Sequence, residues 1–83
     1  MELWIRSQDK MLLRKPEQLG ISEGDDFWYI AENLTVEYGR YKTKERALEV
    51  LDEIQQSLLD NDIPYTGAVI SFNNKIVYVM PEE

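Results

Sequence analysis

The chain contains neither cysteine nor histidine, and this absence constrains both the fold and the chemistry available to its 83 residues. A disulfide or a zinc site often stabilises a domain of this size, so here an apolar core has to hold the fold. Histidine is the side chain that titrates near neutral pH, and cysteine is the readiest nucleophile. We therefore expect a single non-enzymatic domain over residues 1–83, with no metal and no cofactor.

The charge is acidic and unevenly spread along the chain. Sixteen acidic and nine basic residues give a net charge of −7, which disfavours direct binding of a nucleic-acid backbone. Four of the nine cations nevertheless fall within seven residues, at Arg40, Lys42, Lys44 and Arg46. The first residues lack a signal-peptide pattern and no apolar run is long enough to span a membrane. We therefore expect a cytoplasmic protein that makes no membrane contact.

The first half of the sequence predicts four strands, because apolar and β-branched residues alternate there between turn residues. The first two strands are expected to pair as a hairpin around a polar turn. In the fourth strand Leu34, Val36 and Tyr38 are expected to point inward, with polar residues between them pointing outward. The strands are expected at residues 3–6, 11–14, 27–31 and 34–38, with a turn-rich loop at 20–26.

The second half predicts one amphipathic helix followed by a hairpin. Thr43 suits the N-cap, and apolar residues recur with helical spacing from about Lys44 to Leu59. Residues 60–64 are rich in aspartate and asparagine and end in proline, so they are expected to stop the helix. Two final strands, residues 68–72 and 75–80, are joined by two asparagines that tolerate a positive φ. The expected apolar stripe of the helix is Ala47, Val50, Leu51, Ile54 and Leu58.

The expected fold class is α+β, with the order ββββαββ: a twisted antiparallel β-sheet with one amphipathic helix packed on one face. Several strands, such as Phe27–Ala31 and Ile76–Met80, are apolar on both faces. One helix covers only one face of a sheet, and the other face would be left in water. We therefore expect a homo-oligomer, a dimer or higher, in which a second copy covers that face.

Three stretches resemble a family of short proteins carried by bacteriophages, prophages and mobile elements of Gram-positive bacteria. They are Trp4–Lys10, Gly39–Gln55 and Val77–Glu83, which together make up under half of the chain. The resemblance implies an origin in a mobile element. Small non-enzymatic phage proteins often counter host defence, some as oligomeric sponges for a nucleotide immune signal and others by blocking a defence protein.

Two clusters suit an anionic ligand. In the first, Arg6 offers a fork for phosphate, Gln8 an amide for a base edge, and Trp4 a ring for stacking. The alternative is a polar β-turn in which Asp9 accepts backbone N–H bonds and Arg6 pairs with a carboxylate. Both interpretations stay open at this point.

The second cluster is the basic run, where Arg40, Tyr41 and Lys42 precede the predicted helix. Backbone N–H groups at a helix N-terminus favour anions, so these cations could form a phosphate pocket within an acidic protein. The alternative is a solvated face on which the cations balance nearby acidic residues, namely Glu37, Glu45 and Glu49.

Three functions follow from these patterns. The first is sequestration of an anionic nucleotide immune signal, such as a cyclic nucleotide, without cleaving it. The second is an acidic protein-binding inhibitor, whose carboxylates between residues 49 and 62 imitate nucleic acid in a basic groove of a host defence enzyme. The third is a structural or oligomerisation module. For the first function, ligand contacts are expected from Trp4, Arg6, Gln8, Arg40, Tyr41 and Lys42.

Overall fold

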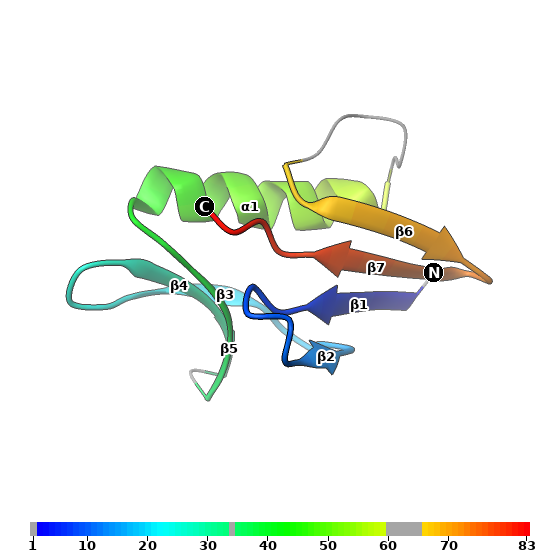
Figure 1. Cartoon of the computed structure of the whole chain (residues 1–83), viewed down its shortest axis with the longest axis horizontal. Helices are drawn as coiled ribbons and strands as arrows, with labels where there is room; N and C mark the ends of the chain where they lie inside the picture. Colours follow the sequence, from blue (N-terminus) through cyan, green and yellow to red (C-terminus); the bar gives the residue numbers. More distant parts are fainter. Residues whose placement is uncertain (1, 34, 60–65) are drawn as a thin grey trace.

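The computed structural model describes residues 2–33, 35–59 and 66–83. The described chain forms seven strands and one helix, so the α+β class is confirmed (Figure 1). The elements are β1 (Glu2–Arg6), β2 (Leu13–Arg14), β3 (Gly20–Glu23), β4 (Trp28–Glu32), β5 (Val36–Tyr41), α1 (Lys44–Ser57), β6 (Ala68–Phe72) and β7 (Lys75–Val79).

The strands form two sheets, which corrects the expectation of a single sheet in the order ββββαββ. Sheet A has the order β2-β1-β7-β6, and sheet B has the order β3-β4-β5. Strand β1 pairs antiparallel with β2, as expected, but parallel with β7, so sheet A is not wholly antiparallel. Local alternation reports which face of a strand is buried; it does not report which distant strand lies alongside.

Strand β3 lies in the segment that was predicted to be a loop. It pairs antiparallel with β4, from Gly20 opposite Ala31 to Glu23 opposite Trp28. The turn that follows is closed by a 2.8 Å bond from the N–H of Gly24 to the carbonyl of Phe27. This strand was missed because it is only four residues long, begins with a glycine and is followed by a glycine and two aspartates.

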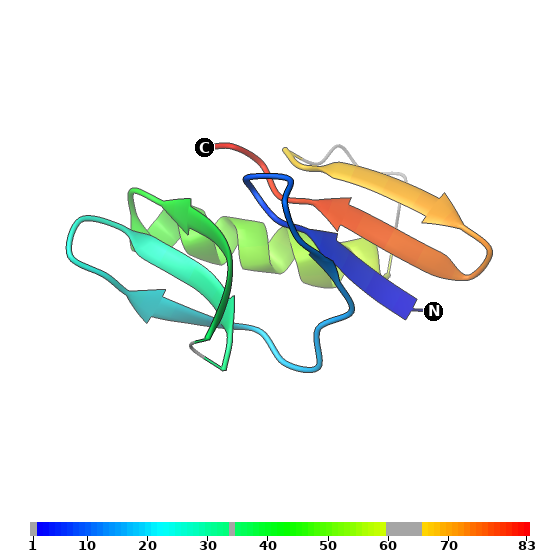
Figure 2. The ribbon, with the colours of Figure 1, turned by 60° about the horizontal axis from the view of Figure 1, so that its bottom comes forward.

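Helix α1 contacts strands of both sheets and lies on one side of them (Figures 1 and 2). The Thr43 hydroxyl accepts the N–H of Arg46 at 3.1 Å, which confirms the predicted N-cap. The buried residues of the helix are centred on Val50 and include Ser57, whereas Leu58 is 41% exposed. The predicted stripe is confirmed at Ala47, Val50 and Ile54, with Leu51 half-buried against the core, and is wrong at Leu58. The predicted helix stop at 60–64 and Leu34 lie outside the described residues.

The core lies between α1 and the two sheets. Three buried tyrosines take part in it, and each phenol donates to an acceptor: Tyr38 to Glu32 at 2.9 Å, Tyr41 to the carbonyl of Pro81 at 2.9 Å, and Tyr78 to a glutamate of α1 at 2.8 Å. Burial raises the pKa of Tyr38 to about 12. The buried core residues are Ile5, Ile30, Tyr38, Tyr41, Ala47, Val50, Ile54, Tyr78 and Met80.

Two local predictions are confirmed. Asn73 and Asn74 both have a positive φ, 47° and 64°, and form the tight turn between β6 and β7. In β5 Tyr38 is buried and Glu37 is exposed, as the alternation predicts.

Among the described residues, no helix is both long and apolar enough to cross a membrane.

Glu53 joins α1 to the start of β6. Its carboxylate accepts from the N–H of Thr66 at 3.0 Å, the hydroxyl of Thr66 at 2.6 Å, the N–H of Gly67 at 3.2 Å and the phenol of Tyr78 at 2.8 Å. Burial alone would raise the pKa of Glu53, but these donors outweigh it and hold the pKa below the usual value.

We expect Glu53→Gln to lower the free energy of unfolding at neutral pH by about 1–3 kcal/mol, because a neutral amide cannot accept all these bonds. The folded pKa lies below the unfolded value of 4.5, so the wild type keeps this stabilisation above pH 4.5 and loses it as the pH falls through the folded pKa. Urea unfolding against pH should therefore show the two proteins converging in acid. The exposed neighbour provides the control, since Asp52→Asn should change little. A constant gap at all pH values would contradict the assignment.

Candidate functional site

The turn after β1, the end of β5 and the C-terminal residues meet at one corner, which we call the Gln8 corner. The Gln8 amide oxygen accepts the N–H of Arg40 at 3.0 Å. Its Nε2 donates to the carbonyls of Arg40 at 3.1 Å, Pro81 at 3.1 Å and Glu82 at 2.6 Å. The backbone N–H of Gln8 also donates to the carbonyl of Tyr38 at 2.7 Å. One side chain thus links sheet A, sheet B and the chain beyond β7.

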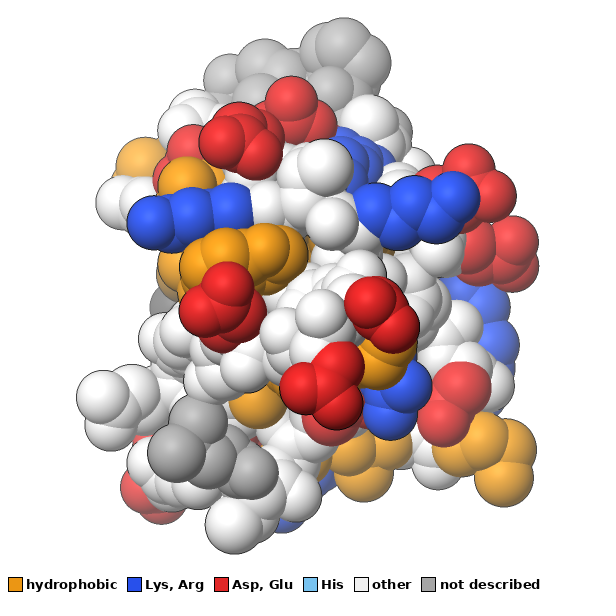
Figure 3. Space-filling view, turned by 90° about the vertical axis from the view of Figure 1, so that its left-hand side faces the viewer, with side chains coloured by type: hydrophobic (Ala, Val, Ile, Leu, Met, Phe, Trp, Pro, Cys, Tyr) orange, Lys and Arg blue, Asp and Glu red, His pale blue; other side chains and the backbone are white. Residues whose placement is uncertain are grey.

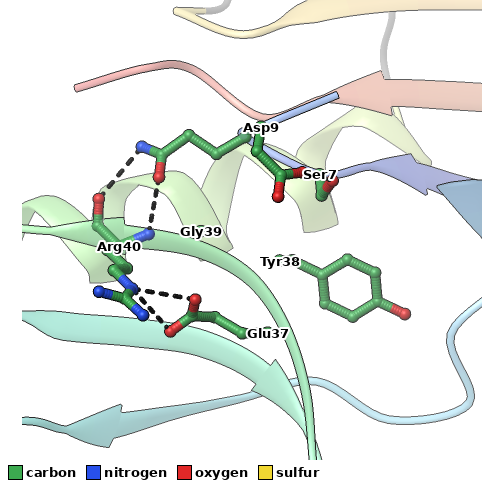
Figure 4. A pocket seen from close by; sticks show the side chains of 7 residues that line it. Ser7, Asp9, Glu37, Tyr38, Gly39 and Arg40 are labelled. Carbon is green, nitrogen blue, oxygen red and sulfur yellow. Dashed lines mark hydrogen bonds and ion pairs between the residues drawn. The ribbon is translucent and has the colours of Figure 1, made fainter. Parts of the chain in front are cut away.

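Two hollows flank this corner, and Arg40 lines both. The first, of about 230 Å³, lies beside the turn after β1 (Figure 4). The second, of about 410 Å³, lies where β5 leads into α1. The first is lined by Ser7, Gln8, Asp9, Glu37, Tyr38, Gly39 and Arg40, and the second by Arg40, Tyr41, Lys42, Arg46, Glu82 and Glu83.

The first hollow is built on a polar turn. The carboxylate of Asp9 accepts the hydroxyl of Ser7 at 2.6 Å and the N–H of Met11 at 2.9 Å. These two donors hold the pKa of Asp9 below its usual value, so it is ionised at neutral pH. The turn alternative is confirmed for Asp9. With Glu37 on the opposite side, two carboxylates line this hollow and disfavour an anion there.

Contacts with one carboxylate and two aromatic rings hold the Arg40 side chain. Its Nε lies 3.0 Å from both carboxylate oxygens of Glu37 (Figure 4). Its guanidinium carbon lies 4.7 Å from the ring centre of Phe27 and 5.4 Å from that of Tyr29. Gln8 holds its backbone N–H and carbonyl. Neither Nη1 nor Nη2 of Arg40 has a hydrogen-bond partner among the described residues.

Arg46 is bonded to other residues of the chain, including the C-terminal Glu83, and does not present a free guanidinium to solvent. It donates to Glu49 at 2.9 Å, to the hydroxyl of Thr66 at 3.0 Å, and twice to the main-chain oxygen of Glu83 at 3.0 and 2.7 Å. Lys44 lies 5.5 Å above the ring of Trp28. Figure 3 shows basic and acidic side chains interspersed on this end of the described surface. For Arg40 and Arg46, the structure therefore favours the alternative of cations balanced by neighbouring acids.

The structure brings four of the six predicted site residues together, namely Gln8, Arg40, Tyr41 and Lys42. It places Trp4 and Arg6 on sheet A, where neither lines either hollow. The indole N–H of Trp4 donates to Glu2 at 2.8 Å.

Three of the predicted residues, Arg6, Gln8 and Tyr41, make hydrogen bonds within the chain. Arg6 donates its Nε to the carbonyl of Lys10 at 2.7 Å, and the described residues include no carboxylate in ion-pair distance of it. Gln8 uses its amide on backbone groups, and Tyr41 is 2% exposed with its phenol bonded to Pro81. Gln8 and Tyr41 thus have structural contacts where base reading and stacking were predicted. Of the predicted residues that line the two hollows, Arg40 and Lys42 are exposed; Arg6 is exposed too, but lies away from both hollows.

Sequence reasoning missed the residues that hold Arg40 in place. Tyr29 lies directly opposite Arg40 in the β4–β5 pairing. The predicted strand ended at Tyr38, whereas β5 continues to Tyr41, so this contact was not predicted. Gly24 supports it, because a Cβ there would collide with the Tyr29 ring. The sequence carried no signal that Glu82 and Glu83 would return to line the second hollow.

Comparisons with family models, with curated proteins and with solved structures find no match for this chain. Within the described ranges, no three acidic side chains cluster in a way that could hold a metal ion. The site is therefore interpreted from its own geometry.

We expect Gln8→Ala to lower the free energy of unfolding by about 1 kcal/mol, because the bonds of its amide to Arg40 and to the residues after β7 are lost. Gln8→Glu should be worse at neutral pH, since a carboxylate would face three carbonyl oxygens. Its deficit should shrink in acid, where the carboxyl group regains a proton to donate. Amide hydrogen exchange at Arg40 and denaturant unfolding measure both effects. Gln55→Ala, on the exposed face of α1, is the control, and equal stability of all four proteins would refute the role of Gln8.

Proposed function

We propose that the protein is a non-enzymatic binding protein that sequesters an anionic nucleotide signal, with Arg40 and Lys42 as its phosphate contacts. The observation that carries this proposal is the fixed guanidinium of Arg40. Its Nε, its π-face and its backbone are all engaged by the chain, while Nη1 and Nη2 have no partner among the described residues. A planar pair of N–H donors is suited to bidentate binding of phosphate.

The constraint on Arg40 favours binding because little side-chain entropy remains to be lost when a ligand arrives. Lys42 is exposed and lines the same hollow. The volume of about 410 Å³ falls within the range of small-molecule sites, roughly 300–1,000 Å³. A nucleotide phosphate could thus contact both cations at once.

Glu82 and Glu83 line the same hollow and oppose an anion. We therefore expect the ligand to carry more than one phosphate group or to displace Glu82 and Glu83 from the hollow. The proposed class of ligand, a nucleotide immune signal, comes from the resemblance of residues 4–10, 39–55 and 77–83 to short phage proteins. A protein of this kind would work in the cytoplasm of the host cell.

We expect a cyclic dinucleotide, a cyclic trinucleotide or a cyclic ADP-ribose isomer to raise the Tm. At about 100 times its Kd, a ligand adds roughly 2.7 kcal/mol, which is about ten degrees or more for a domain this small. Arg40→Gln with Lys42→Gln should abolish the shift. Lys75→Gln, which removes a cation at the far end of β7, should keep it. Neutralising Glu82 and Glu83 as Gln should increase it.

The ligand should be recovered intact from the complex by chromatography. A flat response to the whole panel would reject this proposal, and so would an unchanged shift in the Arg40 and Lys42 variant. Recovery of a cleaved ligand would reject the non-enzymatic part of it.

A second candidate is an acidic inhibitor of a basic host enzyme, and one observation favours it. Glu45 and Asp52 are exposed on α1 and lie beyond ion-pair distance of any described cation, whereas Arg40 and Arg46 are paired. This candidate predicts capture of a nuclease from host lysate that weakens steeply with salt and is lost with Glu45→Gln and Asp52→Asn. Capture that is indifferent to both changes would exclude these carboxylates as the binding surface.

A further inference from the structure

One face of sheet A is turned away from α1, and no described helix or strand packs on it; we call it the outer face. Alternation along the strands assigns its residues: Ile5 and Tyr78 are buried toward the helix, so their neighbours in the strand point the other way. In Figure 2 the helix lies behind the sheets. The apolar residues of the outer face are Trp4, Leu13, Ala68, Ile70, Val77 and Val79.

Trp4, Val77 and Ile70 form one apolar row across β1, β7 and β6. Val79 and Ala68 form a second, shorter row, which Arg6 separates from Leu13. Val77 lies between Trp4 on β1 and Ile70 on β6, and it pairs in register with both. Ile70 is 56% exposed and Leu13 is 48% exposed. Such a contiguous apolar surface on a small protein is typical of a surface that another molecule covers.

Trp4 is prepared for burial. A buried indole N–H needs an acceptor, and the carboxylate of Glu2 already supplies one at 2.8 Å within the same strand. A partner that covers the Trp4 ring therefore leaves no donor unsatisfied. The bond to Trp4 also lowers the pKa of Glu2, so Glu2 stays charged at neutral pH.

The charges at the two ends of β1 identify the partner. Along the outer face β1 carries Glu2 at one end, Trp4 at the centre and Arg6 at the other end. Two cations lie near the Glu2 end: Lys75, in register beside Glu2 on β7, and Lys15, 4.0 Å from its carboxylate. A two-fold axis between two such faces, perpendicular to β1, puts Trp4 over Trp4 and each Glu2 over the Arg6 of the other copy. A parallel arrangement of the two β1 strands would put like charges together, and like charges are unfavourable.

We propose that the protein forms a two-fold symmetric homodimer through the outer face of sheet A, with the two β1 strands antiparallel and Glu2 of each copy paired with Arg6 of the other. Sheet A of one copy packs face to face with sheet A of the other, about 10 Å apart, as in a β-sandwich. Each helix then lies on the outside of the dimer. The interface is isologous, so the same residues serve on both sides. It does not use the Arg40 hollow, so it stands independently of the proposed ligand.

Sedimentation velocity of the full chain and two charge-reversal variants test this arrangement. The wild type should sediment as a dimer. Glu2→Arg and Arg6→Glu should each raise the dimer dissociation constant by about tenfold or more, because both symmetric pairs become repulsive. Mixing the two variants should restore the dimer, since every facing pair then has opposite charges. Glu2→Arg also removes the hydrogen bond from Trp4, which could itself weaken the dimer. If the mixture recovers the dimer, the loss of that bond is not the cause of dissociation.

Two apolar variants test the surface itself. Ile70→Glu should give a folded monomer, and Leu48→Glu, an exposed leucine of α1, should leave the dimer intact. Circular dichroism confirms that each variant is folded. A monomeric wild type, a dimer that survives Ile70→Glu, or a mixture that fails to recover would each overturn the proposal.

Discussion

The side-chain amide of Gln8 accepts one backbone N–H and donates to three carbonyls, and the relative placement of the two sheets depends on it. Helix α1 alone could pack on either sheet, because its apolar side contacts both. The amide adds a directional constraint, since its bonds are made only when β5 and the residues after β7 lie on either side of it. Directional polar contacts of this kind favour one arrangement over near alternatives.

Several carboxylates of this acidic chain accept hydrogen bonds or pair with a cation within the fold. Glu32 accepts from Tyr38 and from the N–H of Glu17, Glu37 holds Arg40, and Glu53 holds the start of β6. These carboxylates are structural acceptors as much as surface charges. The net charge of −7 therefore overstates the acidity that a partner meets, and the cluster of four cations overstates the basicity. The outer edge of Arg40 is held in place by the chain, and it makes no hydrogen bond to the described residues.

The features that could be predicted from the sequence are those that adjacent residues determine. The Thr43 cap, the Asn73–Asn74 turn and the burial of Tyr38 each depend on a few neighbours in the chain. The parallel pairing of β1 with β7 depends on residues at opposite ends of the chain, and no local pattern records it.

The candidate site follows the same division. The basic run and the residues of the turn after β1 could be found by type and spacing, and the structure does bring Gln8 next to Arg40. Their roles could not be found, because a glutamine that binds backbone groups and one that binds a ligand look identical in a sequence. Gln8 binds backbone groups because Pro81 and Glu82 lie beside it, and the position of these two residues follows from the tertiary fold.

The parallel pairing of β1 and β7 also determines how the molecule bears load. The chain enters this pair at Glu2, beside Lys75, and leaves it beyond Val79, beside Arg6. A force that pulls the two ends apart therefore slides the strands along each other. Sliding loads the whole ladder of hydrogen bonds between them together, whereas a hairpin pulled from its open end gives way one bond at a time. The pair that closes the longest loop in the fold is thus the one placed in shear.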